Sequence, residues 1–431
     1  MRAPSCSRNP ASSSIPPEPS PPNLRRCRRA SVTNRAKRIC KGVSALPDDF
    51  TLLQVTPELE TGGAEQTTLD ISRAVVRAGG RSLVASRGGR MAARLKADGG
   101  RLIALPMQSK NPLTILANAE RLKTVIRRNK VSVVHARSRA PAFSAYLAAR
   151  ACGVPYLATY HGVYEAKGEL KRWYNAIMTR GEVVIANSAY TRERVIAEHD
   201  LAPEKVIAID RGVDLERFDP ARMTPERIAT LARACELKAD DGRARLILAG
   251  RLTRWKGQGL LVEAAARLKA QGRTPPLILL VGDDQGRGGY RGELLAAIEA
   301  ANLKDSVRLL GHCDDMPAAY GLAEFACAPS LKPEPFGRTA VEPQAMGLPV
   351  LAADHGAARE TVADGETGWL VAPGDAEAWA TAIARAAALP PGARKAMGEA
   401  AMARARRLYS VEAMSEATLA IYARLAAPTK P

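Results

Sequence analysis

Short apolar runs alternate with amphipathic segments from residue 51 onward, and the runs fall into two series. The first series predicts strands at Thr51–Val55, Ser82–Ala85, Leu102–Leu105, Val131–Val134, Tyr156–Thr159, Val183–Ala186 and Val206–Ile209. The second predicts strands at Arg245–Ala249, Leu277–Val281, Val307–Leu310, Phe325–Ala328, Val350–Ala353 and Trp369–Val371. Apolar residues at helical spacing predict helices at Leu113–Asn129, Gly257–Gln271, Gly289–Ala301, Arg338–Met346 and Ala376–Leu389. Strands that alternate with helices form parallel sheets from right-handed β-α-β units.

The boundary between the two series divides the chain into two domains. The segment Asp210–Pro220 contains glycine and proline, and we interpret it as a hinge. We therefore predict an α/β protein with two Rossmann-like, doubly wound domains, residues 49–213 and 214–405, that face each other across a cleft. The pattern is helical from about Arg394, and a helix within residues 406–431 is expected to pack back toward the first domain and brace both. Ligands of open parallel sheets bind beyond the carboxyl ends of the strands, so we expect the functional residues in loops that follow strands.

Net charge changes this picture only in part. The 431 residues include 63 Lys and Arg against 44 Asp and Glu, a formal net charge of +19, which at first suggests nucleic acid or an anionic membrane as partner. However, residues 1–42 hold ten basic residues and one acidic residue in a Pro- and Ser-rich segment, and we predict a disordered basic tail over residues 1–48. An organellar transit peptide is the alternative that this composition leaves open. Residues 43–215 carry 25 basic and 17 acidic residues, whereas residues 216–431 carry 28 and 26.

Composition and cysteine usage exclude several classes of protein. The chain is 46% hydrophobic, which is too much for a fully disordered protein. It has no uninterrupted apolar stretch of about 18 residues, so no membrane-spanning helix is expected. Outside the tail, Cys152, Cys235, Cys313 and Cys327 are far apart and lack metal-ligand spacing. We interpret them as reduced thiols of a cytoplasmic protein.

One glycine-containing loop follows the first strand of each series. Gly62-Gly63-Ala64-Glu65 precedes a helix, where Gly63 would let a phosphate approach free N–H groups, although a plain tight turn explains it equally well. The pattern is neither G-x-G-x-x-G nor a Walker motif, which argues against nicotinamide binding and ATP hydrolysis. In the second series, Arg251 and Lys256 flank a turn before Gly257. Two cations there suit a diphosphate, and an ordinary basic turn is the alternative.

The segment Pro333–Glu342 gives the strongest signal. Glu334 lies between two prolines, and Gly337 precedes a helix whose first amides would face an anion. Glu342 lies about one turn further along, and such carboxylates suit the recognition of sugar hydroxyls. In the first domain, His161 directly follows a strand and precedes Gly162, which suits a position in the cleft. A satisfied structural histidine is the alternative for His161.

Taken in order, these motifs resemble the retaining glycosyltransferases of family 4, which have the GT-B fold. The resemblance covers nearly all of residues 50–425 and rests on Gly-Gly-Ala-Glu, Tyr-His-Gly, Ala-Asn-Ser, Arg-Gly-Val-Asp, Gly-Arg…Lys-Gly, Leu-Leu-Gly…Asp-Asp and Glu-x7-Glu. The family usually has Asn where Arg211 stands. The stretch Leu170–Thr191 looks more specifically like bacterial lipopolysaccharide core glycosyltransferases.

The resemblance implies a second domain that binds a nucleotide sugar and a first domain that binds the acceptor. Arg251 and Lys256 would neutralise the diphosphate, Glu334 would hold sugar hydroxyls, Glu342 would bind the ribose and His161 would face the reacting groups. The implied catalytic residues are His161, Glu334, Arg251 and Lys256. The implied donor-binding residues are Gly63, Arg251, Lys256, Glu334, Phe336, Gly337, Arg338, Thr339 and Glu342. No cofactor or metal is expected, because the chain has no Asp-x-Asp and the two cations suffice for the charge.

The expected donor is a UDP- or GDP-hexose, and the expected acceptor is a glycan or glycolipid of the lipopolysaccharide core or another cell-envelope polysaccharide. The basic segment Leu113–Lys130 suggests peripheral contact with anionic lipid on the cytoplasmic face of the inner membrane, although a solvated helix face explains it equally well. A nucleic-acid-binding protein is an alternative that the low aromatic content of 4% disfavours, so no nucleic acid partner is expected. A nucleotide-sugar 2-epimerase of the same architecture is a further alternative.

Overall fold

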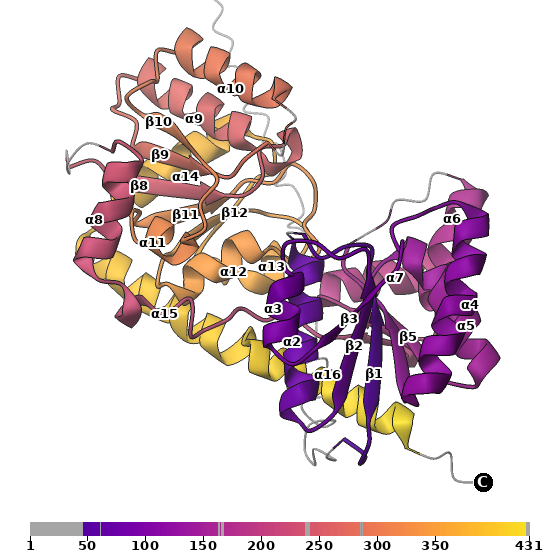
Figure 1. Ribbon diagram of the computed structural model, residues 1–431. Coiled ribbons are helices and arrows are strands. Elements are labelled where there is room, and N and C mark those ends of the chain that lie inside the picture. The colour runs from indigo at the N-terminus through magenta and orange to yellow at the C-terminus, as the bar shows by residue number, and fades with distance from the viewer. Residues whose placement is uncertain are drawn as a thin grey trace, which may run out of the picture.

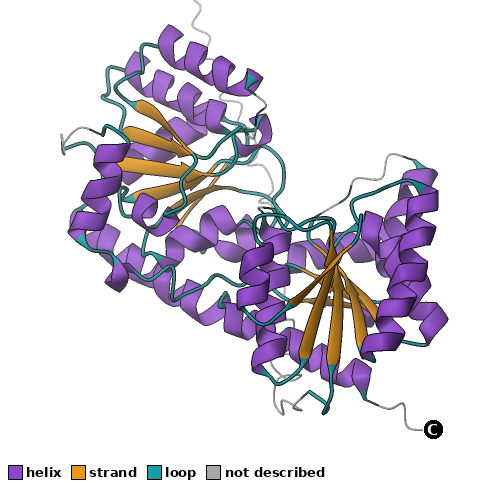
Figure 2. Cartoon of the chain, viewed as in Figure 1, coloured by secondary structure: helices purple, strands orange, loops and turns teal. Residues whose placement is uncertain are grey.

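The computed structural model describes residues 46–60, 62–162, 164, 168–237, 242–284, 286 and 288–427. These residues form two parallel β-sheets, each covered by helices (Figure 1). The sheets stay separate, and helices and loops connect them (Figure 2). The predicted α/β class with two Rossmann-like sheets is confirmed. Most of the predicted disordered tail, residues 1–45, lies outside the described residues.

The first domain is built on a seven-stranded sheet with the spatial order β3-β2-β1-β4-β5-β6-β7. Its strands, all paired in parallel, are β1 (Thr51–Val55), β2 (Arg81–Ser86), β3 (Arg101–Ala104), β4 (Val133–Ala136), β5 (Tyr156–Tyr160), β6 (Val183–Ala186) and β7 (Val206–Ala208). Its helices are α2 (Gly63–Arg77), α3 (Ala92–Ala97), α4 (Pro112–Asn129), α5 (Arg139–Cys152), α6 (Glu169–Asn175) and α7 (Ala189–His199). The strand order reverses between β1 and β4, so the loop before α2 lies at the switch point where such sheets bind ligands.

The second domain repeats this plan with a six-stranded sheet in the order β10-β9-β8-β11-β12-β13. Its strands, also parallel, are β8 (Arg245–Ala249), β9 (Leu277–Val281), β10 (Val307–Gly311), β11 (Phe325–Ala328), β12 (Val350–Ala353) and β13 (Gly368–Val371). Its helices are α8 (Pro225–Ala234), α9 (Gln258–Ala270), α10 (Gly289–Ala300), α11 (Met316–Tyr320), α12 (Arg338–Ala345), α13 (Ala358–Thr361) and α14 (Ala376–Ala387). Here the order reverses between β8 and β11, which places the loops after these two strands side by side.

One strand begins two residues later than the apolar pattern predicts. The run Val131–Val134 predicted a strand, but α4 ends at Asn129, Lys130 follows in a left-handed conformation with φ 48°, and the sheet pairing begins only at Val133. The second half of β4 contains the fully buried His135, whose ring nitrogens lie 2.5 Å from the Tyr422 hydroxyl and 2.7 Å from the Thr159 hydroxyl. A polar residue whose partners are supplied by the tertiary structure does not extend an apolar run in the sequence.

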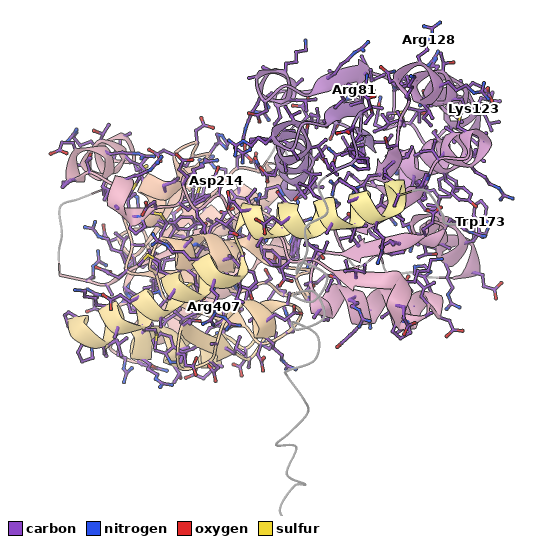
Figure 3. The ribbon with its side chains drawn as sticks, turned by 90° about the horizontal axis from the view of Figure 1, so that it is seen from below. Arg81, Lys123, Arg128, Trp173, Asp214 and Arg407 are labelled. Carbon is purple, nitrogen blue, oxygen red and sulfur yellow. The ribbon has the colours of Figure 1, made fainter. Side chains whose placement is uncertain are left out.

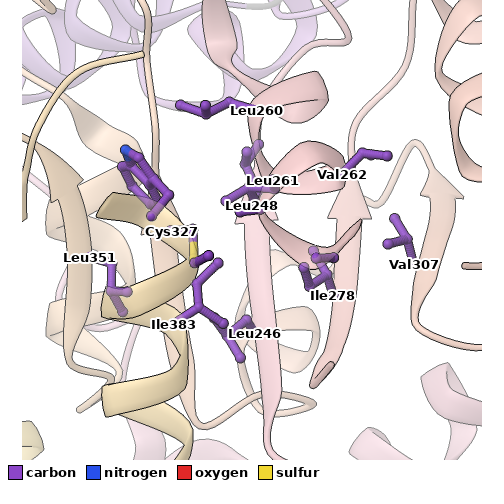
Figure 4. Packing of buried hydrophobic residues seen from close by; sticks show 14 of the residues in the cluster. Leu246, Leu248, Leu260, Leu261, Val262, Ile278, Val307, Cys327, Leu351 and Ile383 are labelled. Carbon is purple, nitrogen blue, oxygen red and sulfur yellow. The ribbon is translucent and has the colours of Figure 1, made fainter. Parts of the chain in front are cut away.

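Apolar side chains cover both faces of each sheet, as expected for parallel strands buried between helices. In the second domain, Leu246, Leu248 and Ile278 pack with residues of α9 and α14 in one cluster (Figure 4). Trp379 of α14 is fully buried in this cluster, and its indole N–H donates to the carbonyl of Ala372 at 3.2 Å. Such cores hold the strand ends, and therefore the loops that follow them, in fixed positions.

Two long helices close the fold, α15 (Pro391–Leu408) and α16 (Val411–Ala426) (Figure 1). Helix α15 packs against α12 of the second domain, whereas α16 packs against α2 of the first domain. Tyr422 of α16 is buried and stacks on Phe50 with ring centroids 6.0 Å apart. Where the chain returns, Val213 donates to the carbonyl of Tyr409 at 2.7 Å and accepts from Val411 at 3.2 Å. The two passages of the chain between the domains therefore lie side by side.

Candidate functional site

Loops that follow strands in the two sheets contact each other directly. Ser188, between β6 and α7, donates from its hydroxyl to the carbonyl of Pro335 at 2.5 Å and also accepts from the N–H of Thr191 at 3.0 Å. It is therefore both a helix cap and a contact between the domains. Glu360 of α13 accepts hydrogen bonds from the N–H groups of Ala189 at 2.9 Å and Tyr190 at 2.6 Å. We call this meeting of post-strand loops the junction.

Lys256 and Glu334, predicted from separate motifs, form an ion pair in the second domain. Nζ of Lys256 lies 2.6 Å from Oε1 of Glu334, and the side chains are only 13% and 15% exposed. Lys256 follows β8 and Glu334 follows β11, and these strands are neighbours in the sheet. The hydroxyl of Ser330 also donates to Oε1 of Glu334. The structure therefore brings together a cation and a carboxylate that lie 78 positions apart in the sequence.

Arg251 lies in the same loop as Lys256 and is exposed to solvent. Its carbonyl accepts a hydrogen bond from the side chain of Gln258 at 2.9 Å, which fixes the loop against α9. The loop is closely packed, because a Cβ atom on Gly282 would lie 2.1 Å from the carbonyl oxygen of Gly250. The structure thus places Arg251 and Lys256 in one closely packed loop after β8.

Helix α12 begins at the predicted anion-binding turn. Gly337 precedes it with φ 88°, a conformation that residues other than glycine rarely adopt. The hydroxyl of Thr339 is buried and has no hydrogen-bond partner among the described residues. A cavity of about 10 Å³, roughly the room that one water molecule needs, lies beside this turn and is lined by Glu334, Thr339 and His355 among others.

Phe336 has a different position from its neighbours in the motif. Its side chain is only 2% exposed and packs edge-on against Tyr409, with ring centroids 5.6 Å apart and an interplanar angle of 76°. The aromatic ring therefore belongs to the core that holds the returning chain. Only the backbone of Phe336 is left to contact a ligand.

Glu342 lies one turn into α12 and is held by two side chains. The hydroxyl of Tyr320 donates to its Oε2 at 3.3 Å, and Nε of Arg338 lies 3.7 Å from its Oε1. Burial raises the pKa of Glu342, and the charge of Arg338 opposes this effect. Arg338 also donates to the carbonyl of Gly212 at 3.2 Å. Arg338 thus connects the predicted donor site to the hinge.

His161, directly after β5, contacts Arg211 from the hinge. Nη2 of Arg211 lies 2.9 Å from Nδ1 of His161 and donates to the His161 carbonyl at 3.3 Å. Nε2 of His161 is buried and has no partner among the described residues. Burial, together with the charges of Arg211 and Arg137, lowers the pKa of His161 well below its usual value. The ring is therefore neutral at physiological pH, and only one of its two nitrogens has a hydrogen-bond partner.

Gly63 lies against the same guanidinium group. A Cβ atom on Gly63 would lie 2.5 Å from Nη1 of Arg211, so only a glycine leaves Arg211 its observed position. Gly63 was predicted to let a phosphate approach here, and the guanidinium of Arg211 lies beside it. Gly63, His161 and Arg211 therefore come together at the start of α2.

Sequence reasoning missed two residues of the junction. Arg211 drew attention only as a departure from the usual family motif. His355, shortly after β12, lines the cavity beside Glu334, and both of its ring nitrogens are buried without a partner among the described residues. The signal that could have found it is the one used for His161, because His355 also follows a strand and precedes a glycine.

Within the described ranges, no group of three or more His, Cys, Asp or Glu side chains is arranged to hold a metal ion. The four cysteines there, Cys152, Cys235, Cys313 and Cys327, are free thiols. Among the same residues, no helix is long and apolar enough to cross a membrane.

Comparison with known proteins agrees with this architecture. The model of glycosyl transferases group 1 matches residues 235–404, and the model of glycosyltransferase family 4 matches residues 61–217. A D-inositol 3-phosphate glycosyltransferase from Actinosynnema mirum is 31% identical over 310 residues, which cover 67% of this chain and 72% of that relative. The protein of the same description from Salinispora tropica is 34% identical over 229 residues, 51% of this chain and 46% of the relative. The chain thus spans about half the length of this second relative.

Solved structures give the same result. A glycosyltransferase from Rickettsia africae is 32% identical with a TM-score of 0.82, and the alignment covers 89% of this chain and all of that one. HepE from Anabaena in complex with UDP-glucose is 23% identical with a TM-score of 0.74, covering 86% and 98%, and shares the fold. Two Rossmann-like sheets whose post-strand loops meet define a GT-B protein. The chain belongs to the GT-B glycosyltransferases of group 1 and family 4.

Proposed function

We propose that the protein transfers a hexose from a nucleoside diphosphate sugar to a glycan or glycolipid acceptor, with retention of the anomeric configuration. The observation that carries this proposal is the Lys256–Glu334 ion pair, held at 2.6 Å in the loops beside the junction. A nucleotide sugar presents a diphosphate for the cation and hydroxyls for the carboxylate. Membership of the glycosyltransferase family supports the same assignment.

Stabilisation of the departing diphosphate is the main catalytic contribution that these residues offer. Arg251 and Lys256 would neutralise its charge, and the amides at the start of α12 would donate hydrogen bonds to it. A fixed donor of this kind contributes about 10²–10³-fold to turnover in enzymes where it has been removed. Glu334 would accept hydrogen bonds from the donor sugar, and Glu342 from the ribose.

His161 would act on the reacting sugar. Its Nε2 atom is buried and has no partner among the described residues, so it is free to contact a bound sugar. In the proposed step, the acceptor oxygen bonds to the anomeric carbon on the face that the diphosphate leaves, and the bond from that carbon to the diphosphate breaks. The acceptor proton passes to the departing phosphate oxygen, so no other base is required. Closure of the domains would exclude water from this step.

A pocket in the first domain supports an acceptor of mixed charge and apolar character. Its volume is about 540 Å³, and it is lined by Lys110, Arg139, Leu170, Lys171, Trp173 and Tyr174. The guanidinium of Arg139 lies 3.9 Å from the ring centroid of Tyr164, and Tyr164 in turn lies close to Gly162, the residue after His161. The three cations suit phosphate groups of a glycolipid, and the aromatic rings suit sugar faces. A lipopolysaccharide core or another cell-envelope glycan has this chemistry.

Exposed apolar side chains gather at the same end of the domain and support contact with a membrane. Leu113 and Leu116 at the start of α4 are 77% and 55% exposed, and Leu170 and Trp173 of α6 are 80% and 60% exposed. Trp173 lies at the outer edge of the first domain, on the side of the molecule that also carries Lys123 and Arg128 of α4 (Figure 3). This mixture is typical of surfaces that insert into anionic bilayers. We propose that the enzyme works at the cytoplasmic face of such a bilayer.

The decisive experiment is a screen of UDP- and GDP-sugars for protection against thermal unfolding. A true donor at about 100 times its dissociation constant adds roughly 2.7 kcal/mol to the free energy of unfolding. The variant Glu342→Ala should lose most of this protection. Glu399→Ala, which changes an exposed carboxylate on α15, is the matched control and should keep it. Absence of protection by every nucleotide sugar would contradict the proposal.

A further inference from the structure

The side chain of Arg211 extends from the hinge toward His161, although Arg211 is not among the predicted catalytic residues. Its backbone is fixed by the returning chain, because a Cβ atom on the next residue, Gly212, would lie 2.4 Å from Cα of Val411. Its guanidinium contacts His161 twice and fills the space beside Gly63. Because contacts hold both its backbone and its guanidinium group, the Arg211 side chain has one defined position.

We propose that Arg211 is a positioning residue that holds His161 in a single tautomer, with the lone pair on Nδ1 and the proton on Nε2. A guanidinium has N–H donors only, so a ring nitrogen 2.9 Å from Nη2 must accept. In a neutral imidazole the other nitrogen then carries the proton. The second bond, from Nη2 to the His161 carbonyl, fixes the backbone of the same residue.

The surroundings of Arg211 and His161 indicate that Arg211 orients His161 and is not part of a structural salt bridge. Arg211 forms no salt bridge with a carboxylate among the described residues, and its Nε is buried without a hydrogen-bond partner. The charged and titratable groups that face it are Arg338, Arg137, Tyr164 and Glu65, so cations outnumber the one carboxylate. A buried cation with so little compensation is costly unless an anion or a fixed dipole faces it. The imidazole lone pair supplies part of this compensation, and a bound anion would supply the rest.

The consequence for the proposed reaction is a neutral, oriented N–H donor. Arg211 and Arg137 both disfavour a second proton on His161, and burial acts in the same direction, so the pKa of His161 stays low. A neutral imidazole with its proton on Nε2 can donate a hydrogen bond to a sugar oxygen. This consequence rests on the proposed function, whereas the tautomer itself does not.

Nitrogen-15 spectra of protein labelled at histidine test the tautomer without any substrate. The chain has five histidines, and the signals lost in His161→Gln identify those of His161. In the wild type we expect one tautomer, protonated at Nε2, with no second protonation as the pH is lowered from 8 toward about 6. In Arg211→Asn we expect averaging between tautomers and a higher pKa of His161, because one of the cations that lower it is removed.

Two further variants separate positioning from a general structural effect. Gly63→Ala should displace the flexible end of Arg211 without removing its charge, and it should produce the same averaging. Arg211→Lys keeps a donor and a charge, and it should restore the single tautomer at least in part. Arg407→Asn, an exposed arginine at the end of α15, is the control and should leave the His161 signals unchanged.

The proposal is overturned if the His161 signals in folded Arg211→Asn and Gly63→Ala match the wild type. Activity adds an independent readout with UDP-glucose as the donor probe. Loss of orientation should lower kcat more than it raises KM, since the imidazole acts on the reacting sugar. If no nucleotide sugar is turned over, the proposed function fails while the spectra still decide the role of Arg211.

Discussion

Nζ of Lys256 lies 2.6 Å from Oε1 of Glu334, and this distance joins the loops after the two central strands of the second sheet. The side chains of the two residues are 13% and 15% exposed. The pair is mostly buried, so removal of either member leaves a partly desolvated charge behind. Donor binding would supply new partners to both residues, a diphosphate to Lys256 and hydroxyls to Glu334.

We expect Lys256→Ala and Glu334→Ala each to lower the free energy of unfolding by about 1–3 kcal/mol, because each leaves one charge without its partner. The double variant should lose less free energy of unfolding than the two single variants lose in sum, because it leaves no unpaired charge. Urea denaturation measures these free energies. Turnover should fall by about 10²–10³-fold in either single variant.

The pair Arg254–Glu293 provides a matched control, since its side chains are 70% and 52% exposed. Its alanine variants should change the free energy of unfolding by no more than about 1 kcal/mol and leave turnover intact. Equal effects at the two pairs would contradict a special role for Lys256 and Glu334.

The exposed apolar end of the first domain should determine membrane binding. Replacement of Leu170 and Trp173 by serine is expected to reduce sedimentation with anionic vesicles at low salt by about tenfold or more, because both side chains would insert into the lipid. Leu295→Ser, at a 45% exposed position on α10, is the control and should sediment like the wild type. Failure of the wild type to sediment would remove the membrane proposal.

The hinge should make stability depend on pH through Asp210. Burial, and the nearby charge of Glu360, raise the pKa of Asp210 to about 7. The unfolded chain loses this proton near its ordinary value of 3.8, whereas the folded chain keeps it until about pH 7. The free energy of unfolding should therefore fall between about pH 4 and pH 7 as the pH rises.

Asp210→Asn should remove this slope, and urea denaturation of the two proteins at several pH values can compare them. Below pH 4 the difference in free energy of unfolding between the two proteins should be constant. Between pH 4 and pH 7 this difference should change by a few kcal/mol in favour of the variant. Parallel curves for the two proteins would show that Asp210 does not titrate in this way.

Docking of α16 should depend on the hydrogen bond between Tyr422 and His135. Tyr422→Phe leaves Nδ1 of the fully buried His135 without its partner, which should cost about 1–3 kcal/mol of unfolding free energy. Tyr146→Phe removes a hydroxyl whose contact is with the exposed Arg150, and it should cost much less. Urea denaturation followed by circular dichroism measures both.

We expect turnover to continue in the presence of EDTA, because Arg251 and Lys256 can carry the charge on the diphosphate. The measurement is sugar transfer before and after chelation, with magnesium added back as the control. Loss of turnover on chelation, with recovery on addition of magnesium, would contradict metal independence.

Most of the fold could be predicted because its strands are buried on both faces and therefore read as apolar runs. β4 was placed two residues early, since His135 in its second half is polar and finds its partners only in the folded chain. The motif residues Lys256 and Glu334 could each be predicted from local pattern, but their pairing depends on the order of strands. A sequence pattern gives neighbours along the chain, and the sheet order decides neighbours in space.

The contacts of Arg211 could not be predicted for a related reason. Its position is set by the returning segment Tyr409–Met414, nearly 200 positions away, through close packing on Gly212. No periodicity near Arg211 reports this packing. His355, in contrast, had the same local signal as His161 and could have been found.

The packing of α16 on the first sheet also bears on how the protein is made. The hydrogen bond between His135 and Tyr422 closes a loop of 287 residues that includes the whole second sheet. When the first domain emerges from the ribosome during synthesis, α16, which covers one face of its sheet, has therefore not yet been made. Phe50 and its apolar neighbours therefore remain exposed to solvent until α16 is synthesised after the second domain. The first domain to emerge is thus the last to be completed, and premature chain termination before Val411 would leave an aggregation-prone sheet even though all of its strands are present.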